Sequence, residues 1–539
     1  MIGLKKYVLL HKSEMAMLSG LIVLIEALTV YGSVLNADIL NALIAHNFAQ
    51  FMKNVALLLT VWLLVVLTEY IEGVYQEVVI QNIDISIRNN IAKLLIRKSY
   101  SEYNAKPYGV YESWINNDIQ VINEQGLSPL FVVIQGAVGT VFAVLTLIKY
   151  HWSLALVALV LAGLIILLPK IFDKKLAEKN LKLTQGNERF VNRTQDVLSA
   201  FNLLYAFQTL HLLVDGIKES SKLIKTAYVN RSKFQIAVQV TGFMGNVVSQ
   251  VILIGLSGIL AFQKLVKIGT INAVGSLAGN IFNSLGNMSN FLGMIRGTRP
   301  IFAKYPLIDD QPADTDLRPH AKQLLTAPAV LQTKDLSFSY DAKKPILNHV
   351  NLTFLRNKKY LILGESGAGK STLLKLLAGY IPGYQGQILL EGMSLTEYRP
   401  AEISRRLLYL DQSPQVLQTT VRNNLSLGAQ FSDQQLIEAL LKMKLIQSTD
   451  EGKDYLNLDI GESGKNFSGG QIQRLALARG LIREIPVMLI DEGTSAIDEQ
   501  TAVQIEMALL KNPKLTLIMI SHTPHPQTEK LFDKVIHFS

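Results

Sequence analysis

Six apolar stretches in the first 300 residues constrain the fold of this chain more than any other feature. Crossing a hydrocarbon core of about 30 Å takes about 20 helical residues. The six stretches lie near residues 15–35, 55–70, 129–148, 152–169, 234–262 and 268–295. The chain is 49% hydrophobic and only 18% charged, which is typical of a protein with a membrane component. We therefore predict a six-helix transmembrane domain over residues 1–299.

Two long polar connections, residues 71–128 and 170–233, separate these predicted spans. Both keep an apolar helical period, so we expect long helices that continue out of the membrane. Basic residues gather in the second connection and at the N-terminus. They are Lys5, Lys6, Lys12, Lys170, Lys174, Lys175, Lys179, Lys182, Arg189 and Arg193. The positive-inside rule then places the N-terminus and both connections in the cytoplasm of a multi-pass protein of the plasma or inner membrane.

The second half of the chain has a different composition. Residues 300–329 are rich in proline and aspartate, which predicts a linker, and residues 330–539 follow an α/β pattern. The chain has no cysteine, which excludes disulfides, thiolate metal sites and a cysteine nucleophile. Its net charge of +9 comes without a basic run or an aromatic-basic patch, so we expect no nucleic-acid partner.

The α/β half contains a phosphate-binding loop, with the sequence GESGAGKST after the apolar residues 360–363. In such a loop, glycines let backbone N–H groups close around the β-phosphate, and the following helix N-terminus favours the anion. Lys370 would reach the β- and γ-phosphates, and the Ser371 hydroxyl would ligate Mg²⁺. The predicted ATP-binding residues of the loop are Gly364, Glu365, Ser366, Gly367, Ala368, Gly369, Lys370, Ser371 and Thr372.

A pair of carboxylates follows the apolar residues 487–490 and supplies the acidic element that such a site needs. Asp491 would hold Mg²⁺ through water, and Glu492 would polarise the water that attacks the γ-phosphate. Carboxylates at a strand end are often only helix caps. The phosphate loop makes the catalytic role the better interpretation here.

The stretch FSGGQIQR, residues 467–474, resembles the signature motif of ABC ATPases, in which Leu is usual where this chain has Phe467. The resemblance implies that Ser468, Gly469, Gly470 and Gln471 contact the γ-phosphate bound to the opposite subunit. A Ser-capped helix start with bare glycine N–H groups is an anion site, in agreement with that role. The resemblance therefore implies a dimer, either of two identical chains or with a second half-transporter.

Four further positions match the ABC ATPase pattern in order and spacing. The resemblance implies that Tyr340 stacks on adenine and that Gln412, the Q-loop glutamine, touches Mg²⁺. It also implies that Asp498 is the D-loop aspartate and that His522 is the switch histidine near the γ-phosphate, with a catalytic role beside Glu492. Each of these residues taken alone would have an ordinary structural role. The assignment depends on their common order and spacing around the two motifs. ATP and Mg²⁺ are the expected cofactors.

The chain resembles exporters more than importers of this superfamily. Residues 459–464, DIGESG, are similar to an exporter-specific segment before the signature, and residues 107–119 and 187–208 are similar to cytoplasmic coupling segments. Six spans contradict a soluble ABC ATPase, and the lack of cysteine contradicts an exporter with its own cysteine peptidase domain. Export of a peptide or another polar or amphipathic compound is the expected function. Multidrug or lipid efflux, and an importer with the exporter fold, such as one for siderophores, stay as alternatives.

Amide side chains mark one face on each of the last two predicted spans. At membrane depth such groups either bond between helices or line a cavity. We hypothesise that they line a polar translocation path. The candidate path residues are Gln239, Asn246, Asn280, Asn283, Asn287 and Asn290.

Overall fold

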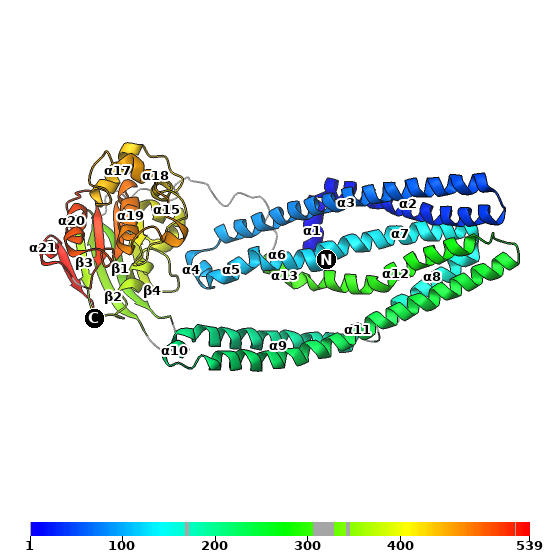
Figure 1. The fold of residues 1–539 in the computed structure, drawn as a ribbon. Coiled ribbons are helices and arrows are strands. Elements are labelled where there is room, and N and C mark those ends of the chain that lie inside the picture. The colour runs from blue at the N-terminus through cyan, green and yellow to red at the C-terminus, as the bar shows by residue number, and fades with distance from the viewer. Residues whose placement is uncertain are drawn as a thin grey trace. The chain divides into compact units, whose positions relative to one another are not determined.

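The computed structural model describes residues 2–167, 171, 173–305, 328–340, 345–522 and 524–538. Packing divides the chain into two units, each with its own buried core (Figure 1). The helical unit comprises Met1–Arg97 and Pro107–Gln311, and the α/β unit comprises Lys98–Lys106 and Pro312–Ser539. The short segment Lys98–Lys106 thus packs with the α/β unit although both of its neighbours in the chain belong to the helical unit.

The helical unit is built from long helices, as the apolar stretches predict. Helices α3 and α11 have 49 and 52 residues, so each is roughly 75 Å long, more than twice the thickness of a hydrocarbon core. The helices of this unit are α1 (Ile2–Leu10), α2 (Lys12–Ile44), α3 (Phe48–Ile96), α5 (Tyr108–Ile115), α6 (Asn117–Ile122), η1 (Asn123–Leu127), α7 (Ser128–Tyr150), α8 (Trp152–Leu167), α9 (Asp173–Ser199), α10 (Phe201–Ala206), α11 (His211–Phe262), α12 (Thr270–Gly297) and α13 (Arg299–Lys304).

The predicted spans 15–35, 55–70, 129–148 and 234–262 fall within single helices, span 268–295 starts two residues before α12, and span 152–169 coincides with α8 except for residues 168–169, which lie outside the described residues. The helices differ in how well they suit a membrane. Among the described residues, four helical segments are long and apolar enough to cross one: Lys12–Ile44, Phe48–Ile96, Tyr108–Tyr150 and His211–Phe262. Trp152–Ile165 is apolar but shorter. Helix α12 does not qualify because glycine and asparagine interrupt it. Its apolar face is buried against the other helices, with Val274 and Leu277 fully covered.

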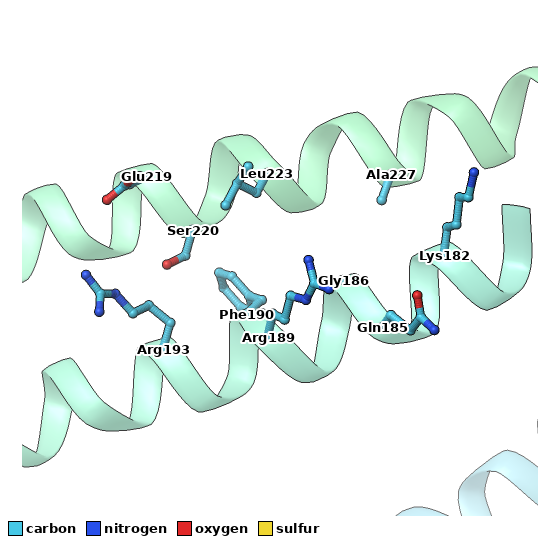
Figure 2. A pocket seen from close by; sticks show the side chains of 10 residues that line it. All are labelled: Lys182, Gln185, Gly186, Arg189, Phe190, Arg193, Glu219, Ser220, Leu223 and Ala227. Carbon is cyan, nitrogen blue, oxygen red and sulfur yellow. The ribbon is translucent and has the colours of Figure 1, made fainter.

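Helices α9 and α11 lie side by side and line an open pocket of about 520 Å³ (Figure 2). The two helices approach closely at Gly186, where an added Cβ would lie 3.6 Å from the Cβ of Ala227. Basic and acidic side chains both line the pocket. They are Lys182, Arg189, Arg193 and Glu219. Three of the basic residues that predict a cytoplasmic location, Lys182, Arg189 and Arg193, thus line this pocket.

An aromatic cluster shows where the first predicted coupling segment, residues 107–119, packs. Trp114 of α5 contacts the Tyr305 ring at a centroid distance of 6.1 Å, and Tyr305 also meets Phe302 of α13. Both Trp114 and Tyr305 are buried. Residues 107–119 therefore pack inside the helical unit, and Lys98–Lys106 is the segment that packs with the α/β unit. An amphipathic pattern with aromatics fits a buried helix as well as a docking helix.

The same cluster corrects the start of the predicted linker. Residues 299–304 form helix α13, and Phe302 and Tyr305 are buried at its end. The other predicted linker residues up to 327 lie outside the described residues. Strand β1 begins at Ala329, one residue before the predicted domain boundary.

The α/β unit contains two sheets. The antiparallel sheet has the order β2-β1-β4-β5, and the parallel sheet has the order β6-β7-β8-β3-β9. The strands are β1 (Ala329–Phe338), β2 (Leu347–Leu355), β3 (Lys359–Leu363), β4 (Gln385–Leu390), β5 (Met393–Ser394), β6 (Leu407–Leu410), β7 (Val487–Asp491), β8 (Thr516–Ile520) and β9 (Lys534–His537). The helices and 3-10 turns are α4 (Tyr100–Asn104), α14 (Lys370–Leu377), η3 (Leu395–Glu397), α15 (Pro400–Arg406), α16 (Val421–Ser426), α17 (Asp433–Lys442), α18 (Gly452–Asn457), η4 (Glu462–Gly464), α19 (Gly469–Ile482), α20 (Glu499–Leu510) and α21 (Pro526–Glu529).

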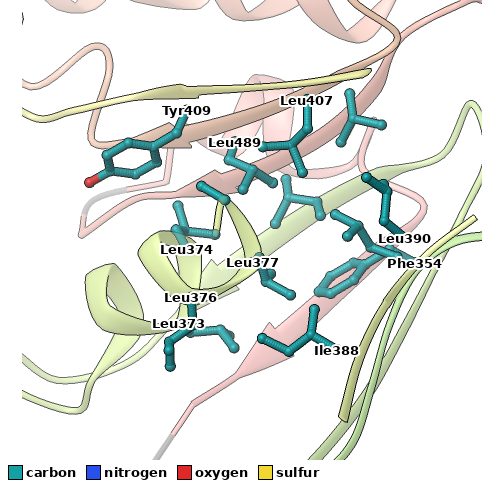
Figure 3. Packing of buried hydrophobic residues seen from close by; sticks show 14 of the residues in the cluster. Phe354, Leu373, Leu374, Leu376, Leu377, Ile388, Leu390, Leu407, Tyr409 and Leu489 are labelled. Atoms are coloured by element: carbon teal, nitrogen blue, oxygen red, sulfur yellow. The ribbon is translucent and has the colours of Figure 1, made fainter. Parts of the chain in front are cut away.

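The core of the α/β unit lies where helix α14 packs between the two sheets (Figure 3). Leu373 and Leu377 of α14, Phe354 of β2 and Ile388 of β4 are all fully buried there. The Phe354 ring meets the Tyr360 ring edge-on at 5.0 Å. Because α14 begins in the phosphate loop, this core fixes the loop against both sheets.

We predict that Phe354→Ala destabilises the α/β unit by about 3–5 kcal/mol, since it opens a cavity in this core. The midpoint of thermal unfolding of the purified chain should fall by on the order of 10 °C. Leu355→Ala is the matched control, because the neighbouring Leu355 side chain is 42% exposed. Equal shifts for the two variants would contradict this placement of the core.

Candidate functional site

The parallel sheet brings four predicted site residues to one edge. Its register aligns Leu410 with Ile490, and both Asp491 and Ile362 with Ile520. Each strand then ends, and polar residues follow at the carboxyl edge, which is where open α/β sheets bind ligands. Gln412, His522 and Gly364 stand two positions beyond Leu410, Ile520 and Ile362, and Glu492 directly follows Asp491.

The phosphate loop has the backbone that the glycine pattern predicts. Gly367 and Gly369 have φ values of 87° and 90°, in the left-handed region that glycine adopts freely. Helix α14 follows with Gly369 as its N-cap. The Lys370 ammonium group is buried and donates to the carbonyl oxygens of Gly364 and Glu365 at 2.8 and 2.7 Å. The loop thus surrounds the Lys370 ammonium group, and the N-terminus of α14 faces the same space inside the loop.

Asp491 is a buried carboxylate beside this loop. Its side chain is 3% exposed, and its Oδ2 atom accepts a hydrogen bond from the Tyr409 hydroxyl at 3.1 Å. The Ser371 side chain also bonds to it. Burial raises the pKa of Asp491, and the Ser371 and Tyr409 hydrogen bonds oppose that rise. The structure therefore joins the two predicted Mg²⁺ residues, Ser371 and Asp491, directly.

Glu492 sits between two other predicted residues. Its Oε1 atom lies 2.7 Å from His522 Nε2, and its Oε2 atom accepts from Gln412 Nε2 at 2.6 Å. Glu492 has a φ of 53°, a left-handed conformation that is rare for a side chain of this size and is often found at functional sites. Three residues from three strand ends thus form one hydrogen-bonded group.

The signature residues form the start of helix α19. The Ser468 hydroxyl accepts from the Gln471 N–H at 3.2 Å, and the Gln471 side chain accepts from the Ser468 N–H at 2.7 Å. This reciprocal capping box holds the helix start in place and leaves Ser468 and Gly469 exposed. A Cβ on Gly470 would lie only 2.6 Å from the carbonyl oxygen of Ala496. The signature helix therefore packs against the D-loop so closely that only glycine fits.

The other two residues matched by resemblance lie at exposed positions. Tyr340 is 61% exposed, and its ring meets Phe338 edge-on at 4.9 Å, which leaves most of the ring accessible. Asp498 caps helix α20, accepting from the Thr501 N–H at 2.9 Å. Hydrogen bonds from Thr501 lower the pKa of Asp498. The cap is the ordinary role of such an aspartate, and the D-loop role stays a prediction.

Several residues that hold the site together were missed from the sequence. Gln473 is buried, and its side chain bonds to the Gln412 carbonyl, the Ser495 hydroxyl and the Ala496 N–H. It thus ties the Q-loop to the D-loop. The available signal was the second Gln of the QIQR segment, which lies on the side of α19 that faces these loops.

A buried guanidinium makes a second such tie. Arg479 donates to the carbonyl oxygens of Asn424 and Gln415, each at 2.7 Å, and to the Asn424 side chain at 2.6 Å. Burial lowers the pKa of Arg479 to about 10. The signature helix is therefore fixed to the segment that follows Gln412.

The structure separates the predicted path residues into two kinds. Asn246 is buried and accepts from Gln250 within helix α11 at 2.8 Å. Asn283 and Asn287 of α12 are exposed, and Asn287 donates to the Asn283 carbonyl at 3.1 Å. Of the rest, Asn280 is half-buried, while Gln239 and Asn290 are exposed. The exposed amides keep bonding capacity for another group, whereas the side-chain oxygen of Asn246 is bonded inside its own helix.

We predict that Gly470→Ala destabilises the α/β unit by about 1–3 kcal/mol, because the new methyl group would overlap the Ala496 carbonyl. Gly469→Ala should be nearly neutral, since its Cβ would meet nothing closer than the Ala496 Cβ at 3.8 Å. Thermal unfolding without nucleotide measures both variants. An unchanged unfolding temperature for Gly470→Ala would contradict the close packing of the signature helix on the D-loop.

Comparison with known proteins agrees with this geometry. A family model described as ABC transporter matches residues 347–495, and one described as ABC transporter transmembrane region matches residues 15–285. The ATP-dependent lipid A-core flippase of Haemophilus ducreyi is 26% identical over 489 residues, which are 88% of this chain and 82% of that protein. The multidrug resistance-like ATP-binding protein MdlB of Buchnera aphidicola is 25% identical over 513 residues, 92% and 85% of the two chains.

A solved structure shares the whole architecture. It is a bacterial Atm1-family ABC exporter with ATP bound, and it superimposes with a TM-score of 0.76 over 98% of this chain and 93% of its own, at 18% sequence identity. Together with the match of the transmembrane region, this likeness accounts for both units. The chain is a multi-pass membrane protein that belongs to the ABC transporter family, with the exporter fold and an ATPase domain fused to its transmembrane region.

Proposed function

We propose that this chain is one half of a dimeric exporter in which Glu492 activates the water that attacks ATP. The observation that carries the proposal is the position of Glu492 between His522 and Gln412, next to the Asp491–Ser371 pair. A carboxylate that accepts from an amide and faces an imidazole is oriented to receive a proton from water. Gln412 and His522 thereby fix the orientation of both Glu492 oxygens.

The residues beside Glu492 suit Mg²⁺. The Ser371 hydroxyl, the Asp491 carboxylate and the Gln412 amide offer the hard oxygen ligands that this ion prefers. Burial of the Asp491 carboxylate also favours a cation close to it. When bound, Mg²⁺ would neutralise charge on the phosphates of ATP. Lys370, on the other side of the loop, would hold the β- and γ-phosphates once it exchanges its loop carbonyls for them.

In the proposed dimer, the signature of each chain completes the ATP site of the other. Ser468 and Gly469 are exposed at a helix start, so they are free to receive the γ-phosphate of the partner's ATP. ATP would close the two ATPase domains, and hydrolysis would let them reopen. The partner is a second copy or a related half-transporter. We further propose that the ATPase domain, the N-terminus and the long helical extensions lie in the cytoplasm, since basic residues gather at the N-terminus and in the second long connection.

The exposed amides of α12 support a polar or amphipathic cargo. Asn283, Asn287 and Asn290 would offer hydrogen bonds to a peptide or to the polar part of an amphipathic molecule. A lipid is a second candidate, because relatives described as lipid A-core flippases cover most of this chain. Both kinds of cargo need a polar lining of the translocation path. They differ in how much apolar surface of the cargo the path must accommodate.

We predict that Glu492→Gln lowers ATP hydrolysis by about a hundredfold or more, because the amide cannot accept the proton from water. ATP binding should persist, and the dimer should stay closed around it. Glu438→Gln is the control, since Glu438 is an exposed carboxylate on α17. Phosphate release and retention of labelled ATP are the measurements. Brisk turnover by Glu492→Gln would refute its catalytic role.

We also predict that the double substitution Asn283→Ala, Asn287→Ala reduces stimulation of ATPase activity by cargo and leaves basal activity unchanged. Short peptides and amphipathic lipids would be tested separately in reconstituted membranes. Asn272→Ala serves as the control, because Asn272 is exposed near the other end of α12. An unchanged stimulation profile for every compound would contradict an amide-lined path.

A further inference from the structure

Three tyrosines connect helix α4 to the carboxylate of Asp491. We propose that Tyr100, Tyr380 and Tyr409, here called the tyrosine link, make the position of Asp491 depend on the position of α4. The inference rests on the proposed function, because it gives that ATP site a route by which the long helix α3 can affect it. It names Tyr409 as a positioning residue for the reaction.

The first part of the link is a short, well-anchored helix. The chain enters the α/β unit at Lys98, directly after α3, and leaves it at Lys106. A capping box fixes the start of α4: the Ser99 hydroxyl accepts from the Glu102 N–H, and the Glu102 carboxylate accepts from the Ser99 N–H. The first residue of α4, Tyr100, therefore has a defined orientation.

Tyr100 meets the ATPase core through its ring. It stacks on Tyr380 at a centroid distance of 4.2 Å and an interplanar angle of 24°. Tyr380 follows α14 directly, and its N–H donates to the Lys375 carbonyl at 2.9 Å. Tyr380 thus stands at the opposite end of the helix that begins in the phosphate loop. Stacked rings are stiff and have a preferred geometry, so a shift of one displaces the other.

The second contact carries the link to the metal-binding carboxylate. Tyr380 meets the Tyr409 ring edge-on, at 5.5 Å and 83°. Tyr409 is 7% exposed, and its hydroxyl donates to Asp491 Oδ2 at 3.1 Å. Asp491 is also bonded to Ser371 of the phosphate loop. A displacement of Tyr409 would therefore move Asp491 relative to Ser371.

Tyr409 also lies three positions before Gln412, which bonds to Glu492. Strand β6 ends between the two residues, so both depend on the same short segment. The tyrosine link thereby connects α4 to Asp491 by direct contact and to Glu492 through the Q-loop. This route uses side chains that a general ATPase site does not need.

The link predicts different requirements at its three positions. Tyr100 and Tyr380 take part in the link through their rings, so phenylalanine should replace either residue without effect. Tyr409 acts through its hydroxyl, so Tyr409→Phe should raise the Mg²⁺ concentration needed for half-maximal hydrolysis by roughly tenfold. Tyr100→Leu should break the link at its other end while it keeps an apolar side chain. Tyr108→Leu is the matched control, since Tyr108 is 74% exposed in the helical unit.

Hydrogen exchange at residues 98–106 tests the link independently of turnover. The whole chain in lipid nanodiscs would be measured without nucleotide and with ATP plus Mg²⁺, and a fluorescent ATP analogue would report occupancy. We expect nucleotide to change the exchange of this segment in the natural chain and in Tyr100→Phe, Tyr380→Phe and Tyr108→Leu. The change should be lost in Tyr100→Leu and Tyr409→Phe at equal occupancy. The double variant Tyr100→Leu, Tyr409→Phe should lose the exchange response to the same extent as Tyr409→Phe alone.

The outcomes separate this inference from the proposed function. If Tyr409→Phe still shows the full change in exchange, or if Tyr380→Phe loses it, the tyrosine link is wrong while the ATP site stands. If the natural chain hydrolyses no ATP, the proposed function itself fails. Retained occupancy with loss of the exchange response in Tyr409→Phe supports the link.

Discussion

The parallel register of β6, β7, β8 and β3 is the constraint on which the rest of the ATP site depends. Backbone hydrogen bonds between these strands align Leu410 with Ile490, and Asp491 with Ile520, which in turn aligns with Ile362. Each strand can then deliver one polar residue just past its end, to the same small region. A shift of one register position would separate Gln412 and His522 from Glu492. The fully buried interiors of β7 and β8 make such a shift costly.

The transmembrane half depends on a different constraint. In lipid every backbone N–H and C=O group must be satisfied within the chain, so long uninterrupted helices are the natural solution. Helices α3 and α11 are longer than the membrane requires. Their additional length carries polar and charged residues typical of water-exposed helices. One consequence is that α3 continues directly to α4, which packs with the ATPase core. Covalent continuity then links the two halves without a separate connecting domain.

The sequence was sufficient for the fold class and the nucleotide-binding motifs, because glycine loops and apolar strands are local patterns with local causes. Ser371 with Asp491, and Gln412 with Glu492 and His522, were predicted separately and are joined in the structure. Tyr409 and Gln473 were missed, because their importance comes from partners 82 and 61 residues away. The packing of segment 107–119 could not be predicted for the same reason: Trp114 is buried beside Tyr305, which a local pattern cannot reveal. Helix α12 combines a buried apolar face with the exposed Asn283, Asn287 and Asn290, and the burial of that face depends on neighbouring helices that a local pattern does not show.

The central claim is that the phosphate loop of one chain and the signature of another form one ATP site. Mixing two inactive variants tests it most directly. Lys370→Ala disables the phosphate loop and Ser468→Arg blocks the signature, so either variant alone should hydrolyse no ATP. In a mixed dimer both defects fall on one site and the second site is intact. The account predicts that ATPase activity returns when the two variants are co-assembled. Failure to recover any activity in verified mixed dimers would contradict it.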